Sequence, residues 1–173
     1  MDSRLLKEFR DIFNNHNIQS SIDYYKVLCL WVNRNKKIFG EHLLHINRLN
    51  VLTSLDIEKY IINSSEIDLN NEVNRIRKID FKSLDGLLMF ISDTMWEMVT
   101  ISSSKECYNC KYGDVRYIKI NYKGCKGKVV LECQDCGQLM NVNGIKITEK
   151  IQNYLPTTRK EVEDAIYPDN NIF

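Results

Sequence analysis

The stretch Cys107-Tyr108-Asn109-Cys110, separated by 22 residues from Cys133-Gln134-Asp135-Cys136, decides how the C-terminal part of this chain folds. Each Cys-x-x-Cys pair can place two thiolates on one cation from a tight turn, and two pairs supply a closed tetrahedral set of four ligands. Gly137 follows the second pair and can take the positive φ angle that aims backbone amides at sulfur. The sequence therefore predicts one structural metal ion, and zinc suits this donor set best. The predicted ligands are Cys107, Cys110, Cys133 and Cys136.

The segment between the two cysteine pairs has the pattern of a β-hairpin. Apolar and polar residues alternate from Val115 to Tyr122, which is the period of a half-buried strand. Residues 123–127 predict the turn, residues 128–132 the returning strand, and residues 139–142 a short third strand. Such a hairpin would bring the two cysteine pairs together.

The stretch from Cys107 to Gly137 resembles the zinc-ribbon superfamily. This resemblance implies two metal-binding turns, called knuckles, and a three-stranded antiparallel sheet. Zinc ribbons occur in transcription factors, ribosomal proteins, enzyme inserts and protein-binding modules, so the resemblance specifies the metal and the fold but not the function. Because four thiolates leave no coordination position for an activated water, we expect a structural site and not a catalytic one.

The cysteines could instead form disulfides, but the rest of the sequence favours metal. The first residues, Met1-Asp2-Ser3-Arg4, do not begin a secretory signal. No apolar run reaches the roughly 18 residues of a membrane-spanning helix. We therefore expect a cytoplasmic protein without a membrane partner, in a compartment that keeps thiols reduced. Cys125, in the predicted hairpin turn, is expected to be a free thiol, and Cys29 a core residue.

Residues 1–104 predict a helical domain, because their apolar residues recur with the helical period. Ser20 with Asp23 predicts a helix start, and Gly40 predicts the end of that helix. Helices are expected at residues 3–16, 20–39, 65–79 and 83–101. Within residues 41–63 we expect two short helices, with a break near residue 53. The helix at 83–101, which carries Trp96, is expected to be the most buried.

Residues 102–104 are a run of serines and predict a linker to the ribbon, which we place at residues 105–150. In the tail, residues 151–173, Thr158 and Glu161 form a capping box that predicts a short helix packing back on the body. The predicted fold class is therefore α+β: an N-terminal helical bundle, then a three-stranded antiparallel zinc ribbon, then a short C-terminal helix.

Charge and motifs limit the functions that this chain can have. The 173 residues carry a net charge of +1, which gives no overall electrostatic footprint for nucleic acid. The cationic excess lies in residues 105–150, with nine Lys and Arg against five Asp and Glu. The sequence contains no phosphate-binding loop, dinucleotide fingerprint or nucleophile elbow. His42 and His45 are expected to be solvated. We therefore expect a protein that is not an enzyme.

Two classes of function remain open. The first is a protein-binding protein, which in size and composition resembles the small cytosolic immunity proteins that neutralise bacterial toxins. That likeness implies a tight complex with a toxin domain, often a nuclease, whose active site is covered. Acidic residues would suit a cationic nuclease cleft, and the lysines of the hairpin would suit an acidic partner surface. These candidate partner-binding residues are Glu66, Asp68, Glu72, Lys119, Lys123, Lys126 and Lys128.

The second class is nucleic-acid binding by the ribbon. Arg116 and the hairpin lysines lie beside Tyr117 and Tyr122, and cations next to aromatic rings suit phosphate contact combined with base stacking. Against this, strand alternation already accounts for the tyrosines, and lysines at a hairpin tip commonly protect a sheet edge.

Overall fold

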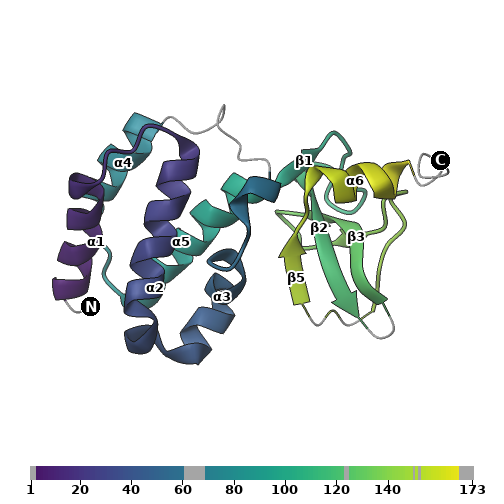
Figure 1. The fold of residues 1–173 in the computed structure, drawn as a ribbon. Coiled ribbons are helices and arrows are strands. Elements are labelled where there is room, and N and C mark those ends of the chain that lie inside the picture. The colour runs from purple at the N-terminus through teal and green to yellow at the C-terminus, as the bar shows by residue number, and fades with distance from the viewer. Residues whose placement is uncertain (1–2, 61–68, 123–124, 150, 152, 168–173) are drawn as a thin grey trace. The chain divides into compact units, whose positions relative to one another are not determined.

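The computed structural model describes residues 3–60, 69–122, 125–149, 151 and 153–167 (Figure 1). The chain divides into two compact units. The first, here called the helical unit, comprises residues 1–57 and 62–98, and the second, the sheet unit, comprises residues 58–61 and 99–173. The α+β class predicted from the sequence is confirmed, with helices first, then an antiparallel sheet, then a short helix.

The helical unit begins much as the sequence predicts. The side chain of Ser20 accepts a hydrogen bond from the Asp23 amide (3.1 Å), and the Asp23 carboxylate accepts one from the Ser20 amide (3.0 Å). This capping box satisfies amides that the helix itself leaves without a partner. At Gly40 the backbone leaves helical geometry (φ 70°, ψ 161°), as predicted, but helical residues resume immediately after it. The helices are α1 (Ser3–Asn15), α2 (Ser21–Ile46), α3 (Leu49–Leu52), the single 3-10 turn η1 (Ile57–Lys59), α4 (Leu69–Lys78) and α5 (Leu84–Val99).

Aromatic side chains from α1 and α2 form much of the core of the helical unit. The ring of Phe9 packs edge-on against Trp31 (centroids 4.9 Å apart) and Phe13 (5.1 Å), and Trp31 packs against Phe39 (5.2 Å). Such pairs add to the free energy gained from burying their area. Two apolar side chains of α2 lie outside this core: Ile22 is 42% exposed and Leu30 is 40% exposed.

Helix α5 is the strongly apolar element expected at residues 83–101. Trp96 is only 4% exposed, and the guanidinium of Arg48 lies over its ring, 5.1 Å from the centroid. The helix ends at Val99, two residues before the predicted end, because Ile101 already belongs to a strand. Six of its apolar side chains have no exposed surface: Leu87, Leu88, Ile91, Met95, Met98 and Val99.

The sheet is antiparallel throughout and has two more strands than predicted. Its strands are β1 (Ile101–Ser103), β2 (Val115–Tyr122), β3 (Cys125–Cys133), β4 (Leu139–Met140) and β5 (Asn153–Pro156). The order is β1-β2-β3-β4, and β5 also pairs with β2. One side of β2 pairs with β3 from Val115↔Cys133 to Tyr122↔Cys125. The other side pairs first with β1 and then with β5.

The serine run, which we expected to be a linker, is largely strand β1. Ser102 pairs with Arg116 and Ser103 with Val115, so the backbone of this segment is engaged in the ladder of β2. The amino-acid composition does not reveal this strand, because serine is not among the residue types enriched in strands. The hydrogen bonds to β2, and not the serine side chains, hold the segment in the sheet.

Helix α6 (Arg159–Ile166) packs on the sheet (Figure 1). Thr158 and Glu161 form the predicted capping box at its start. The ammonium group of Lys119 on β2 donates to the Glu161 carboxylate (2.5 Å). Val162 is buried in a cluster whose other members are Cys107, Val115, Tyr117, Leu131, Cys133 and Met140.

None of the helices in the described part of the chain is both long enough and apolar enough to cross a bilayer.

Candidate metal centre

The four predicted ligands meet at one end of the sheet. Cys107 and Cys110 lie in the loop between β1 and β2, Cys133 ends β3, and Cys136 lies in the turn toward β4. The Sγ atoms of Cys107 and Cys136 are 3.6 Å apart, those of Cys110 and Cys133 are 3.5 Å apart, and all four lie within 4.8 Å of one another. Within the described residues, this is the one group of three or more potential ligands placed to share an ion.

The sulfur–sulfur distances fit a metal ion and not disulfides. A disulfide bond would bring two sulfurs to about 2.05 Å. A tetrahedral ion with metal–sulfur bonds of about 2.3 Å holds its sulfurs about 3.8 Å apart. The observed distances are close to the second value, so the cluster can hold one metal ion and is consistent with a zinc-binding, ribbon-like site.

The first knuckle is shaped by its own backbone. The amide of Lys111 donates to the Cys107 carbonyl (2.8 Å), and Lys111 takes a positive φ of 61°. The amides of Tyr112 and Gly113 then donate to the sulfur of Cys110 and lower the pKa of its thiol. Amide dipoles aimed at sulfur favour the thiolate, which is the form that binds metal.

The second knuckle repeats this geometry. The Gly137 amide donates to the Cys133 carbonyl (3.0 Å), and Gly137 has a φ of 67°, as predicted from the sequence. The side-chain amide of Asn109 donates to Cys136 (3.5 Å), and this contact and the Gln138 amide lower the pKa of Cys136 to about 6. The Cys136 thiol is therefore poised to ionise.

Cys133, like Cys107, is fully buried. Burial raises the pKa of its thiol to about 12, although the amides of Cys136 and Asp135 point at the sulfur and act in the opposite direction. A buried thiol of this kind ionises when a cation is bound next to it, since the ion's charge then compensates for the lost solvent. Ionisation of Cys133 therefore depends on the bound ion.

Gly113 is a site residue that the sequence analysis did not single out. A Cβ atom at this position would lie 2.3 Å from the Cys133 sulfur and 3.1 Å from the Cys110 sulfur. No side chain fits there, so the first knuckle can close over the sulfurs only with glycine. The signal was present as a glycine three residues after Cys110, but its meaning depends on the approach of the other knuckle.

The centre is buried on one side and open on the other. Cys107 and Cys133 have no exposed surface and belong to the cluster that contains Val162 of α6, whereas Cys136 is exposed. Metal binding is thus coupled to the packing of α6 on the sheet.

Three hairpin residues proposed for partner binding or for nucleic-acid binding, Arg116, Tyr117 and Lys119, are engaged inside the sheet unit. Arg116 pairs with Glu132 (2.8 Å), and both side chains are largely buried, at 14% and 10% exposed. Lys119 pairs with Glu161, and Tyr117 is 8% exposed. Lys126 and Lys128 are exposed.

The remaining candidates are spread over the chain. Glu72 forms an ion pair with Arg75 (2.9 Å) on α4. Cys29 is half-buried, and burial raises the pKa of its thiol to about 12. His42 and His45 are exposed, as expected. Glu66, Asp68 and Lys123, together with the side chains of Tyr122 and Cys125, lie outside the described residues.

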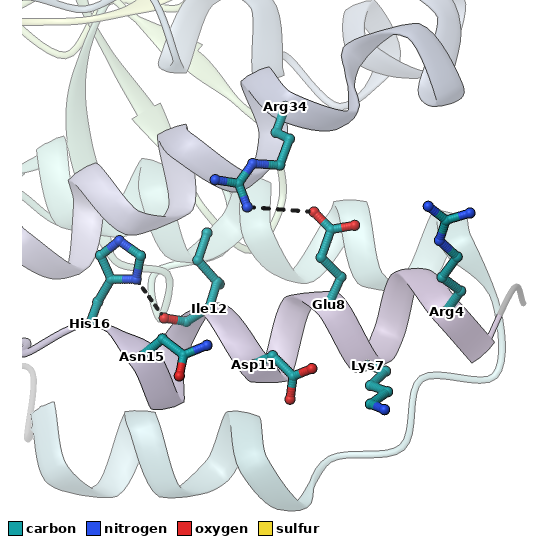
Figure 2. A pocket seen from close by; sticks show the side chains of 8 residues that line it. All are labelled: Arg4, Lys7, Glu8, Asp11, Ile12, Asn15, His16 and Arg34. Atoms are coloured by element: carbon teal, nitrogen blue, oxygen red, sulfur yellow. Dashed lines mark hydrogen bonds and ion pairs between the residues drawn. The ribbon is translucent and has the colours of Figure 1, made fainter.

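The helical unit carries a shallow pocket of about 300 Å³ along α1 that the sequence did not indicate (Figure 2). Arg34 of α2 lies 4.0 Å from Glu8 of α1, and His16 makes a 2.8 Å hydrogen bond to the Ile12 carbonyl. Opposite charges alternate around this pocket, so it has no single electrostatic preference. Its lining is Arg4, Lys7, Glu8, Asp11, Ile12, Asn15, His16 and Arg34.

Comparison with protein-family models, with curated proteins and with solved structures gives no significant match.

Proposed function

We propose that the four cysteines bind one zinc ion, and that this ion stabilises the sheet unit without taking part in a reaction. Four sulfur ligands suit zinc among the common cellular metals, and they fill its tetrahedral coordination sphere. The burial of Cys107 and Cys133 in the core of the sheet unit supports a structural role, because the ion then contributes directly to folding.

We further propose that the protein acts by binding another protein, as an inhibitor of the immunity type that covers the active site of a bacterial toxin. The observation that carries this proposal is the internal pairing on β2. Arg116 and Lys119 already have carboxylate partners, and Tyr117 is buried. Phosphate contact by these side chains would break internal ion pairs, which weakens the nucleic-acid alternative.

Exposed aromatic side chains in the sheet unit support the same proposal. Tyr108 is 51% exposed, Tyr112 93% and Tyr167 60%. Tyrosine is enriched at protein interfaces because its rigid ring buries a large area while its hydroxyl stays hydrogen-bonded.

The test is isolation of the protein from its native host, followed by reconstitution with the purified partner. We expect a stoichiometric complex that persists at about 0.5 M salt, where surface charge is strongly screened. If the partner is a nuclease, its activity should fall in proportion to the fraction bound. Salt-sensitive association with nucleic acid alone, or catalytic turnover by this protein, would contradict the proposal.

A further inference from the structure

Two exposed tyrosines flank a metal ligand on the first knuckle. Tyr108 lies two residues before Cys110, and Tyr112 lies two residues after it. The ring of Tyr112 is almost fully solvated, at 93% exposed, and Tyr108 is half solvated, at 51%. Neither ring contributes to the buried cluster beneath the knuckle. The core of the sheet unit therefore does not account for them.

The backbone that carries Tyr112 is held in place from several sides. Its own amide donates to the sulfur of Cys110, and the residue before it, Lys111, has the unusual φ of 61°. The residue after it, Gly113, lies directly against the sulfur of Cys133. A ring presented from so constrained a backbone loses less conformational entropy on binding than a ring on a mobile loop.

A carboxylate lies next to the backbone of the knuckle that carries Tyr112. An Oδ atom of Asp135 lies 3.0 Å from the position that a Cβ of Gly113 would occupy, which places the carboxylate beside the residue that follows Tyr112. The Asp114 carbonyl accepts the Gln134 amide (2.9 Å), so the two knuckle loops run side by side here. Asp114 and Asp135 are both exposed.

The charge of the two knuckle loops, residues 105–114 and 133–138, is negative. They contain three carboxylates, Glu106, Asp114 and Asp135, against two ammonium groups, Lys105 and Lys111. The ammonium of Lys105 is hydrogen-bonded to the Val142 carbonyl. A divalent ion held by four thiolates adds further negative charge. A phosphate backbone would be repelled here, whereas a cationic group would be attracted.

We propose that the face formed by Tyr108, Tyr112, Asp114 and Asp135, here called the tyrosine face, docks an arginine-rich segment of a basic protein. A guanidinium group can lie flat on a tyrosine ring while its N–H groups donate to a neighbouring carboxylate. Lysine offers no planar surface to the ring and makes point contacts only, so arginine is the better ligand. This inference rests on the proposed protein-binding function and names the chemistry of the partner.

The first experiment titrates the zinc-loaded full-length protein with an arginine nonapeptide, and follows backbone amide shifts by NMR. We expect shifts concentrated in residues 107–114 and 134–136. Tyr112→Ala should weaken binding about tenfold, and Tyr112→Phe less than about threefold, because the ring that faces the guanidinium is retained. Asp135→Asn should weaken binding by a similar factor to Tyr112→Ala, since it removes the paired charge.

Matched controls distinguish recognition of arginine by the tyrosine face from general attraction between charges and from misfolding of the variants. Tyr167→Ala removes another exposed tyrosine and should leave the titration unchanged. A lysine nonapeptide should bind more weakly than the arginine peptide, and an oligothymidylate should not bind. Zinc content measured on every variant shows that the knuckles remain formed. Equal binding by wild type and Tyr112→Ala, or preferred binding of the oligonucleotide, would overturn the inference.

The second experiment uses the natural partner identified as described above. The double variant Tyr108→Ala/Tyr112→Ala should lose at least tenfold in affinity for it. If the partner binds the double variant as well as wild type, the tyrosine face is not the docking site, while the protein-binding function stands. If no protein partner exists, the proposed function fails and this inference fails with it, even where the arginine peptide binds.

Discussion

At the scale of single residues, Gly113 is the most constrained position of the metal centre. In Gly113→Ala the added methyl group would lie 2.3 Å from the Cys133 sulfur, so either the knuckle or the ligand must move. We expect the variant to hold zinc at least tenfold more weakly than wild type, since displaced ligands lose the tetrahedral geometry. Competition with a chromophoric chelator measures this affinity directly.

Gly137→Ala is the matched control for that experiment. Its position has a φ of 67° but no atom within 4 Å of an added Cβ, so the cost is backbone strain alone. That strain amounts to about 1–2 kcal/mol of folding free energy. The variant should be less stable and yet retain stoichiometric zinc. Equal loss of zinc from both glycine variants would show that close packing at Gly113 is not the cause.

Two cysteine variants, one at a ligand and one outside the cluster, provide the second test at this scale. Cys133→Ser should abolish stoichiometric zinc binding, because it removes one of the two fully buried ligands. Cys125→Ser should keep full zinc content, because Cys125 begins β3 while Cys133 ends it, about 26 Å away along an extended strand. Metal analysis after gel filtration reports both results. Loss of zinc from Cys125→Ser would contradict the choice of ligands.

The sequence predicts site residues well where the chemistry is local. The spacing of the cysteines predicted the four that cluster, and the positive φ of Gly137 was predicted from its place after Cys136. Gly113 and the exposure of Tyr112 were not predictable in this way, because both depend on how the two knuckles approach each other. The internal ion pairs of Arg116 and Lys119 were missed for the same reason, since their carboxylate partners lie 16 and 42 residues further along the chain.

At the scale of elements, the start of α2 offers a test that depends on pH. The Ser20 hydroxyl donates to the Asp23 carboxylate (2.8 Å) and, as the largest cause, lowers the pKa of that carboxyl below its ordinary value of 3.8. A lowered pKa stabilises the folded state above the ordinary pKa, and this contribution disappears as the pH falls through the folded-state value. Asp23→Ala should therefore lower the unfolding temperature at pH 7.

The decrease in unfolding temperature caused by Asp23→Ala should become smaller as the pH falls below 3.8, because the Asp23 carboxylate of the wild type then becomes protonated as well. The fluorescence of Trp31 and Trp96, both buried in the helical unit, follows the transition. Lys37→Ala, at an exposed position of the same helix far from Asp23 in sequence, provides the control. If Asp23→Ala lowers the unfolding temperature by the same amount at acid pH as at pH 7, the carboxylate charge is not involved.

Element prediction succeeded for long periodic segments and failed for short ones. α5 and β2 were recognisable because each repeats its apolar pattern over many residues. β1 and β5 have three and four residues, too few to display a period, and their strand conformation comes from pairing with β2. In α2 the apolar residues Ile22 and Leu30 are exposed, and composition alone does not distinguish them from the buried ones.

At the scale of the whole molecule, removal of the metal should affect the two units differently. A strong chelator at neutral pH should release the ion and abolish amide protection in β2, β3 and α6, because Val162 packs on Cys107 and Cys133. The aromatic core around Phe9 and Trp31 contains no metal ligand, so protection in α1 and α2 should persist. Hydrogen exchange with and without chelator measures both effects. Simultaneous loss of protection throughout would mean that the units unfold together.

Strand β2 also sets the order in which the sheet can be completed during synthesis. Its partners β1 and β3 are adjacent in sequence, whereas the edge from Ile118 to Asn121 pairs with Asn153–Pro156. Until that late segment has left the ribosome, the edge presents open amides and carbonyls to any other extended chain. The nascent protein thus passes through a stage in which the cysteine cluster is fully synthesised while the sheet can still recruit a foreign strand. Fast emergence of residues 153–156 protects the chain from self-association.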